Sequence, residues 1–259
     1  MAVHAGGRVN SATGGTISNI NGYTIHTFTS SGTFTASTTG MVEVLVVGGG
    51  GGGGVYNNYG GGGGGAGATL YSKFVPVVAG VACPVTVGAP GGINLSGGTS
   101  IFYYGGPTAP ATTNITAGGG GGGGYWSPSN PGTFIGVSSP TASGGGSSAY
   151  SYTTFGGTGA GVYGLGFPGG GVNGGTMGAG GGGAGSVGGT QPYSSLVFGG
   201  SGVPYSITGT AVTYSVGGPN NAPNIPTGST FGCGGAAQGS NYSSPAVGNS
   251  GAVIIRYPV

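Results

Sequence analysis

Few side chains in this sequence are able to carry out acid–base, nucleophilic or metal chemistry. The charged residues and imidazoles together make a short list: Arg8, Glu43, Lys73, Arg256, His4 and His26. A single carboxylate does not provide the pair of acids that glycoside hydrolysis needs. A nucleophilic triad would have to combine Glu43 with one of the two imidazoles, and His26 lies in an alternating strand pattern where a packed or a surface imidazole is expected. We therefore predict no catalytic residues and no enzymatic activity.

Metal and cofactor sites are not predicted either. The potential metal ligands have no zinc-like spacing: His4, His26, Cys83 and Cys233. A dinucleotide site needs an acidic residue about 20 positions after its glycines, and no acid follows Glu43. A phosphate loop needs Lys followed by Ser or Thr, whereas Lys73 is followed by Phe74. We interpret the two cysteines as buried free thiols, with a single disulfide as the alternative.

The composition restricts the partners of this chain. Charged residues make up 2% of the sequence and the net charge is +2, so the basic surface that nucleic-acid binding requires is missing. A surface with almost no charge favours association, which predicts a homo-oligomer or polymer. The longest apolar run, residues 44–47, is far too short to insert into a membrane. The first residues do not have the pattern of a secretion signal.

Aromatic residues beside the glycine runs are the remaining candidates for a site. Tyrosine and tryptophan offer a large rigid contact surface with a polar group, which suits contact with a receptor or a glycan. The alternative is that they fill and cap the ends of the glycine layers. The candidate contact residues are Tyr56, Asn57, Asn58, Tyr59, Tyr125, Trp126, Tyr150 and Tyr152.

Strands at both ends of the sequence are expected to support these positions. Residues 23–29 and 33–35 alternate and are separated by a turn at 30–32, which predicts a hairpin. Residues 41–47 form a second strand, with valines on one face. Residues 252–257 form a third, and we predict that it pairs with 41–47. That pairing would place Glu43, the only acid, near Arg256; two unrelated surface charges are the alternative.

The central region, residues 48–250, consists largely of glycine, which supplies 73 of the 259 residues of the chain. An extended helix of the polyproline II kind has three residues per turn and no internal hydrogen bonds. Without side chains, such helices can approach closely and bond sideways to their neighbours. We expect residues 48–54 to run up, turn at 55–59 and return along 60–65. The alternative is that the glycine runs are flexible loops between strands.

These observations predict an all-β or irregular fold with essentially no α-helix. In it, a hairpin and terminal strands frame a bundle of packed polyglycine II-type helices. The chain divides into a β-rich start at 1–47, a glycine-rich domain at 48–250 and a closing strand at 251–259.

The order of these segments resembles the glycine-rich domains of bacteriophage tail-fibre and other virion proteins. The resemblance covers residues 23–259 and depends most on VEVLVVGGG at 42–50 and GAVIIRY at 251–257. It implies a sandwich of polyglycine helices on a virion surface or outside the cell, with other virion proteins as partners. It also implies host recognition by loops at one end: residues 55–59, 125–143 and 147–155. No fibre shaft or trimerisation coil is evident.

The function expected from the residues and the resemblance together is non-enzymatic. It is that of a virion structural or adhesive protein of the phage tail-fibre or surface-decoration type, whose loops bind a host cell-surface protein or glycan. The alternative is a self-assembling filament or matrix subunit of a microbe. Ice binding by a flat face of extended helices is a weaker third reading, because a regular Gly-Gly-X repeat is missing.

Overall fold

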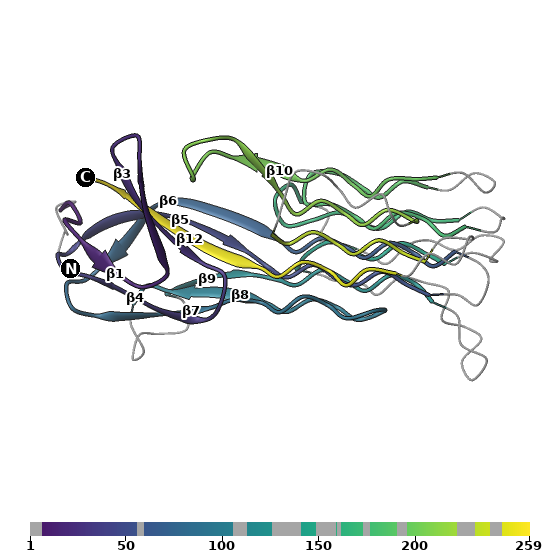
Figure 1. The fold of residues 1–259 in the computed structure, drawn as a ribbon, viewed down its shortest axis with the longest axis horizontal. Coiled ribbons are helices and arrows are strands. Elements are labelled where there is room, and N and C mark those ends of the chain that lie inside the picture. The colour runs from purple at the N-terminus through teal and green to yellow at the C-terminus, as the bar shows by residue number, and fades with distance from the viewer. Residues whose placement is uncertain are drawn as a thin grey trace.

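The structure is a computed structural model, and it describes residues 7–55, 60–105, 113–125, 141–148, 159, 162–172, 177–190, 196–221, 231–238 and 245–259. These residues form strands and extended segments and contain no helix. The all-β prediction is therefore confirmed. Strands gather at the end where both termini lie, and the glycine segments run side by side away from them (Figure 1).

Two five-stranded sheets pack face to face at the end near the termini. The first has the order β1-β4-β7-β8-β9, made of Ala12–Thr13, Gly32–Ala36, Ala82–Thr86, Ser100–Tyr103 and Asn114–Ala117. The second has the order β2-β3-β12-β5-β6, made of Thr16–Ile20, Tyr23–Phe28, Ala252–Pro258, Gly40–Val47 and Thr69–Val77. A two-stranded hairpin, β10 (Val203–Tyr205) with β11 (Val212–Tyr214), completes the strands of the described residues.

The core between the two sheets follows from the alternation of the strands. Val42, Val44 and Val46 point into it from β5, as predicted, while Leu45 and Val47 point to the other face of the sheet. Phe34 and Phe102 meet edge to face in this core, with ring centroids 6.2 Å apart.

Strand β12 pairs with β5 in antiparallel register, which confirms the predicted pairing of residues 252–257 with 41–47. The hairpin predicted at 23–35 is wrong. β3 and β4 are consecutive but belong to different sheets, β3 pairing with β2 and β12, and β4 with β1 and β7. Alternation reports which face a strand buries, and that pattern is the same whether the chain turns back or crosses to the opposite sheet.

The glycine-rich segments lie in three rows, continuous with the sandwich because β5, β9 and β12 run directly into them. Neighbours are identified by backbone hydrogen bonds. The middle row contains residues 88–92, 48–55, 60–68, 177–184 and 186–190. One outer row contains 94–98, 117–125, 142–148 and 166–172, and the other contains 245–251, 231–238, 215–221 and 196–202.

Along each enclosed segment, successive backbone amides donate in turn to three different neighbouring segments. The amides of Gly48, Gly51 and Gly54 donate to residues 60–68. Those of Gly49 and Gly52 donate to 94–98, and those of Gly50 and Gly53 to 245–251. The carbonyls of this run accept from three further neighbours, namely 117–125, 231–238 and 88–92, and that of Gly53 accepts from Asn94. Residues 48–54 are thus surrounded by six neighbouring segments, and the choice of hydrogen-bond partner repeats every three residues.

Glycine is required here by close approach between backbones rather than by unusual dihedral angles. A Cβ atom on Gly51 would lie 2.2 Å from the Gly121 oxygen, and one on Gly52 would lie 1.9 Å from the Gly92 oxygen. Residues 48–54 and 60–68 run in opposite directions, as predicted, because Gly48, Gly51 and Gly54 pair with Ala68, Gly65 and Gly62.

Candidate functional site at the distal end of the glycine segments

Most of the predicted contact residues lie outside the residues that the structure describes. This applies to Tyr56, Asn57, Asn58, Tyr59, Trp126, Tyr150 and Tyr152. Tyr125 is described; it directly follows Gly124 and is half-buried.

The glycine-rich segments in their three rows form an array. The residues that flank these candidates lie at the same distance along the array from the sandwich. Gly54 donates to Gly62, Gly62 donates to Gly124, and Gly124 donates to Gly146. Gln238 donates to Gly54 and so lies at the same level. The connections that leave residues 55, 125, 148 and 238 therefore start together, at the end of the array far from the sandwich (Figure 1). The structure thus brings together the residues that precede the three loops expected to contact a receptor. At the end of the expected loop 125–143, by contrast, Ala142 belongs to the sandwich core and Ser143 donates to Ala66.

Two asparagines at this end continue the backbone pattern with their side chains. The Val55 amide donates to Asn94 Oδ1 at 3.0 Å, after Gly49 and Gly52 have donated to backbone carbonyls of residues 94–98. The Val197 amide donates to Asn220 Oδ1 at 3.0 Å, and Asn220 Nδ2 donates to the Gly178 oxygen at 2.7 Å. Sequence reasoning missed both residues, although an asparagine directly after Gly-Gly-Ile or Gly-Gly-Pro marks a turn.

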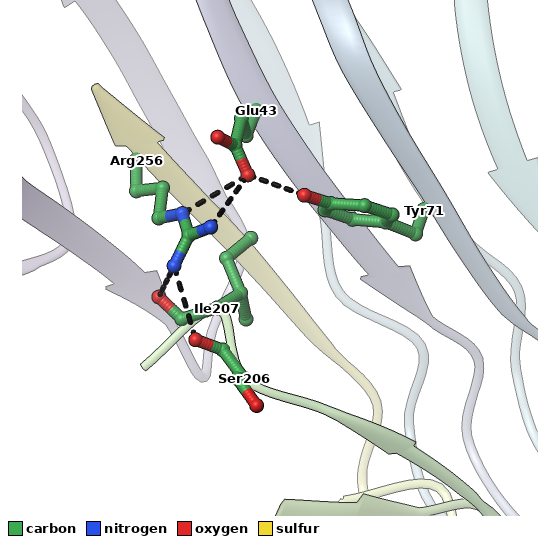
Figure 2. A network of polar contacts seen from close by, with 5 residues as sticks. All are labelled: Glu43, Tyr71, Ser206, Ile207 and Arg256. Carbon is green, nitrogen blue, oxygen red and sulfur yellow. Dashed lines mark hydrogen bonds and ion pairs between the residues drawn. The ribbon is translucent and has the colours of Figure 1, made fainter. Parts of the chain in front are cut away.

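The only acid of the chain lies in a polar network on the outer face of the second sheet (Figure 2). Glu43 Oε2 accepts hydrogen bonds from Arg256 Nη2 at 2.8 Å and Nε at 3.0 Å, which confirms the predicted proximity. The Tyr71 hydroxyl donates to the same oxygen. Burial, and then the carboxylate of Glu43, raise the pKa of Tyr71 to about 12, so Tyr71 remains a donor.

Arg256 also holds the β10–β11 hairpin against the sheet. Its Nη1 donates to the carbonyls of Ser206 at 3.0 Å and Ile207 at 3.4 Å (Figure 2). Beneath the hairpin, Ile207 and Tyr214 pack against the apolar outer side chains of the sheet: Ile25, Leu45, Val47 and Ile254. The network thus holds the β10–β11 hairpin against the outer face of the second sheet.

The two thiols and the imidazole of His26 are buried. Cys83 and Cys233 are free thiols, as predicted, and burial raises the pKa of Cys83 to about 11, which disfavours the nucleophilic thiolate. The ring of His26 is enclosed between the sheets. Within the described part of the chain, no three His, Cys, Asp or Glu residues gather where they could hold a metal ion, and no helix is suitable for crossing a membrane.

The comparison with family models places this architecture in a known class. The model described as "Glycine-rich domain" matches residues 28–258, from the end of β3 through the whole glycine array to β12. A search of curated proteins found no significant match. Because the matched range covers nearly the whole chain, this protein belongs to the glycine-rich domain family.

Proposed function

We propose that this chain is a non-enzymatic structural and adhesive protein of a virion, of the phage tail-fibre or surface-decoration type. In this proposal, the sandwich attaches the molecule to other virion proteins, and the distal connections contact a host cell-surface protein or glycan. The observation that carries the proposal is the common level of the flanking residues Gly54, Gly62, Gly124, Gly146 and Gln238.

The array suits this role because it fixes the ends of its connections. Residues 48–54 donate every backbone amide to a neighbouring segment at 2.8–2.9 Å, so the start of the connection that follows them is held in place. Binding costs less when the contact groups are held in advance. The tyrosines, asparagines and tryptophan of residues 56–59 and 126 combine apolar surface with hydrogen-bonding groups, which is the chemistry that glycans and exposed loops of receptors offer in return.

Replacing the distal aromatic residues tests this proposal. We expect the double variant Tyr56→Ala with Tyr59→Ala, and separately Trp126→Ala, to lower binding to the susceptible host cell at least tenfold, measured by pull-down of cells with labelled protein. Tyr163→Ala is the matched control, because Tyr163 is 63% exposed but adjoins β6 near the sandwich. Equal losses in all variants, or no binding to any candidate host, would contradict the adhesive role.

A second candidate function is a self-assembling filament or matrix subunit, which the two edges of the array favour. Leu95 is 64% and Val247 54% exposed at the edge near residues 88–92. Val187 is 58% and Phe198 66% exposed at the edge near residues 186–190. These edges end the middle row on opposite sides, and contacts between two different faces of identical molecules extend into an open filament unless the rotation between neighbours closes a ring.

Electron microscopy of the isolated protein separates this candidate from the first. A filament subunit is expected to form polymers that are lost in the variant Phe198→Ser and retained in Phe74→Ser, whose phenylalanine is 78% exposed on β6 instead. Discrete particles of the unchanged protein at high concentration would reject the filament role.

A further inference from the structure

The N-terminal strap, defined as residues 12–20, connects the two sheets at one side of the sandwich. Its first part, β1, pairs with β4 of the first sheet, and its second part, β2, pairs with β3 of the second sheet. The strap crosses between the sheets at Gly14 and Gly15, with φ angles of 106° and 63°. A side chain at Gly14 would also collide with the Thr33 oxygen, 2.0 Å from the Cβ position.

A buried histidine touches the strap at this crossing. Nδ1 of His26 lies 2.7 Å from the Gly14 oxygen, and Nε2 lies 3.2 Å from the Tyr257 hydroxyl. A carbonyl only accepts, so Nδ1 carries the proton of the neutral ring and Nε2 accepts from Tyr257. Ala12 of the strap packs against the core cluster that contains Tyr257, and burial raises the pKa of Tyr257 against opposing contributions from Thr24 and the Ala12 backbone. Both sides of the His26 ring are therefore connected to the strap.

Protonation of His26 disfavours this arrangement. A second N–H at Nε2 would require the Tyr257 hydroxyl to turn away and accept a hydrogen bond where it now donates one. A positive charge would also lie beside Phe34, whose ring centroid is 5.2 Å away, inside a core that offers no carboxylate. In the described residues, Tyr257 on β12, Cys83 on β7 and Tyr104 directly after β8 are the titratable groups that face this interior, and Glu43 and Arg256 lie on the opposite face of the second sheet.

We propose that the N-terminal strap is an acid-releasable latch. It stays docked while His26 is neutral, and it detaches when the ring takes up a proton, which lets the imidazolium reach water. Release uncovers the edges of β3 and β4, the two strands with which the strap pairs.

Two further observations support this mechanism. Burial lowers the pKa of His26 below its ordinary value of 6.5, against an opposing contribution from the Gly14 hydrogen bond. The released state, with His26 in water, therefore binds more protons than the docked state, and docking weakens as the pH falls below about 6.5. A cavity of about 230 Å³, bounded by Gly14, Gly15, Thr27 and Thr33 among others, adjoins the crossing, so water reaches the place where the strap must open.

Hydrogen exchange of the full chain tests the latch. We expect the protection factors of amides in residues 12–20 to fall by up to tenfold for each pH unit below 6.5, because one proton is taken up on release. Amides of β5 and β12 should keep their protection over the same range. In His26→Gln the strap amides should lose this pH dependence, because the side chain no longer titrates.

The variant Tyr257→Phe keeps the proposal testable if His26→Gln does not fold. It removes the hydroxyl that donates to His26, so strap protection should already be several-fold lower at pH 7 while β5 is unaffected. Strap protection that is independent of pH in the unchanged protein would overturn the latch. So would a loss of protection shared by all strands, or the same pH dependence in His26→Gln.

Discussion

Replacing Gly64 by alanine is expected to destabilise the protein by about 3 kcal/mol or more. A Cβ atom at this position would lie 2.1 Å from the Gly51 oxygen and 2.7 Å from its carbon. Both residues belong to enclosed segments of the middle row, so neither backbone has room to move away. Urea denaturation of the purified protein, followed by far-UV circular dichroism, measures the difference.

Gly92→Ala is the matched control for this experiment. Gly92 also belongs to the glycine-rich region, but its nearest neighbour would be Cδ1 of Leu95 at 3.5 Å, an ordinary contact. Its dihedral angle φ lies outside the left-handed range, so alanine should be neutral or stabilise by up to about 1 kcal/mol. Equal effects of the two substitutions would show that close backbone packing does not determine where glycine is needed.

Replacing Arg256 by methionine should cost about 2 kcal/mol of unfolding free energy. The substitution leaves the Glu43 carboxylate with the Tyr71 hydroxyl and frees the Ser206 and Ile207 carbonyls from their donor. The cost stays below that of a fully buried pair because the side chains of Arg256 and Glu43 are 18% and 22% exposed. Thermal unfolding of the variant and the unchanged protein measures this effect.

The double variant Arg256→Met with Glu43→Gln shows how much of that cost comes from the unpaired charge. It should be more stable than Arg256→Met alone, since no carboxylate is left without its cation. Lys73→Met, at an exposed position on β6, should change stability by less than about 0.5 kcal/mol. An Arg256→Met effect no larger than that of Lys73→Met would contradict the role of the network as a fastening.

The parts of the fold that follow from side-chain chemistry were predictable from the sequence. Alternation in residues 41–47 and 252–257 reveals two strands of similar strength, and their pairing brings Glu43 to Arg256. Burial of Cys83 and Cys233 was expected because a cysteine that binds no metal and forms no disulfide usually packs as a small apolar side chain. In each of these cases the type of side chain indicates whether the residue is buried or which residue it pairs with.

The N-terminal strap was missed although it carries a signal. Asn21-Gly22 has φ angles of 51° and 78°, which is the type I′ turn that this dipeptide favours in two-residue hairpins. The signal was hidden because β2 is exposed along its whole length and shows no apolar alternation. For His26 the sequence left a packed and a surface imidazole open, because its partners Gly14 and Tyr257 are distant in sequence and only the fold brings them together.

The arrangement of the glycine segments in rows was not predictable. A glycine run contains no side chain that could specify its neighbour, and residues 48–54 would present the same surface to any partner. The outcome depends on the strands that lead into each segment, on the non-glycine residues at the exposed edges, and on caps such as Asn94 and Asn220. Length and composition predicted packing, but not which segment lies beside which.

Scalar couplings across hydrogen bonds, measured by NMR on deuterated, ¹⁵N,¹³C-labelled protein, test the backbone packing most directly. The structure predicts couplings from the amides of Gly51, Gly52 and Gly53 to the carbonyls of Gly65, Leu95 and Ala246, which belong to three different segments. Couplings that join consecutive amides of this run to one partner strand, as in a β-ladder, would contradict the account. The absence of couplings together with exchange at the rate of an unstructured chain would do the same.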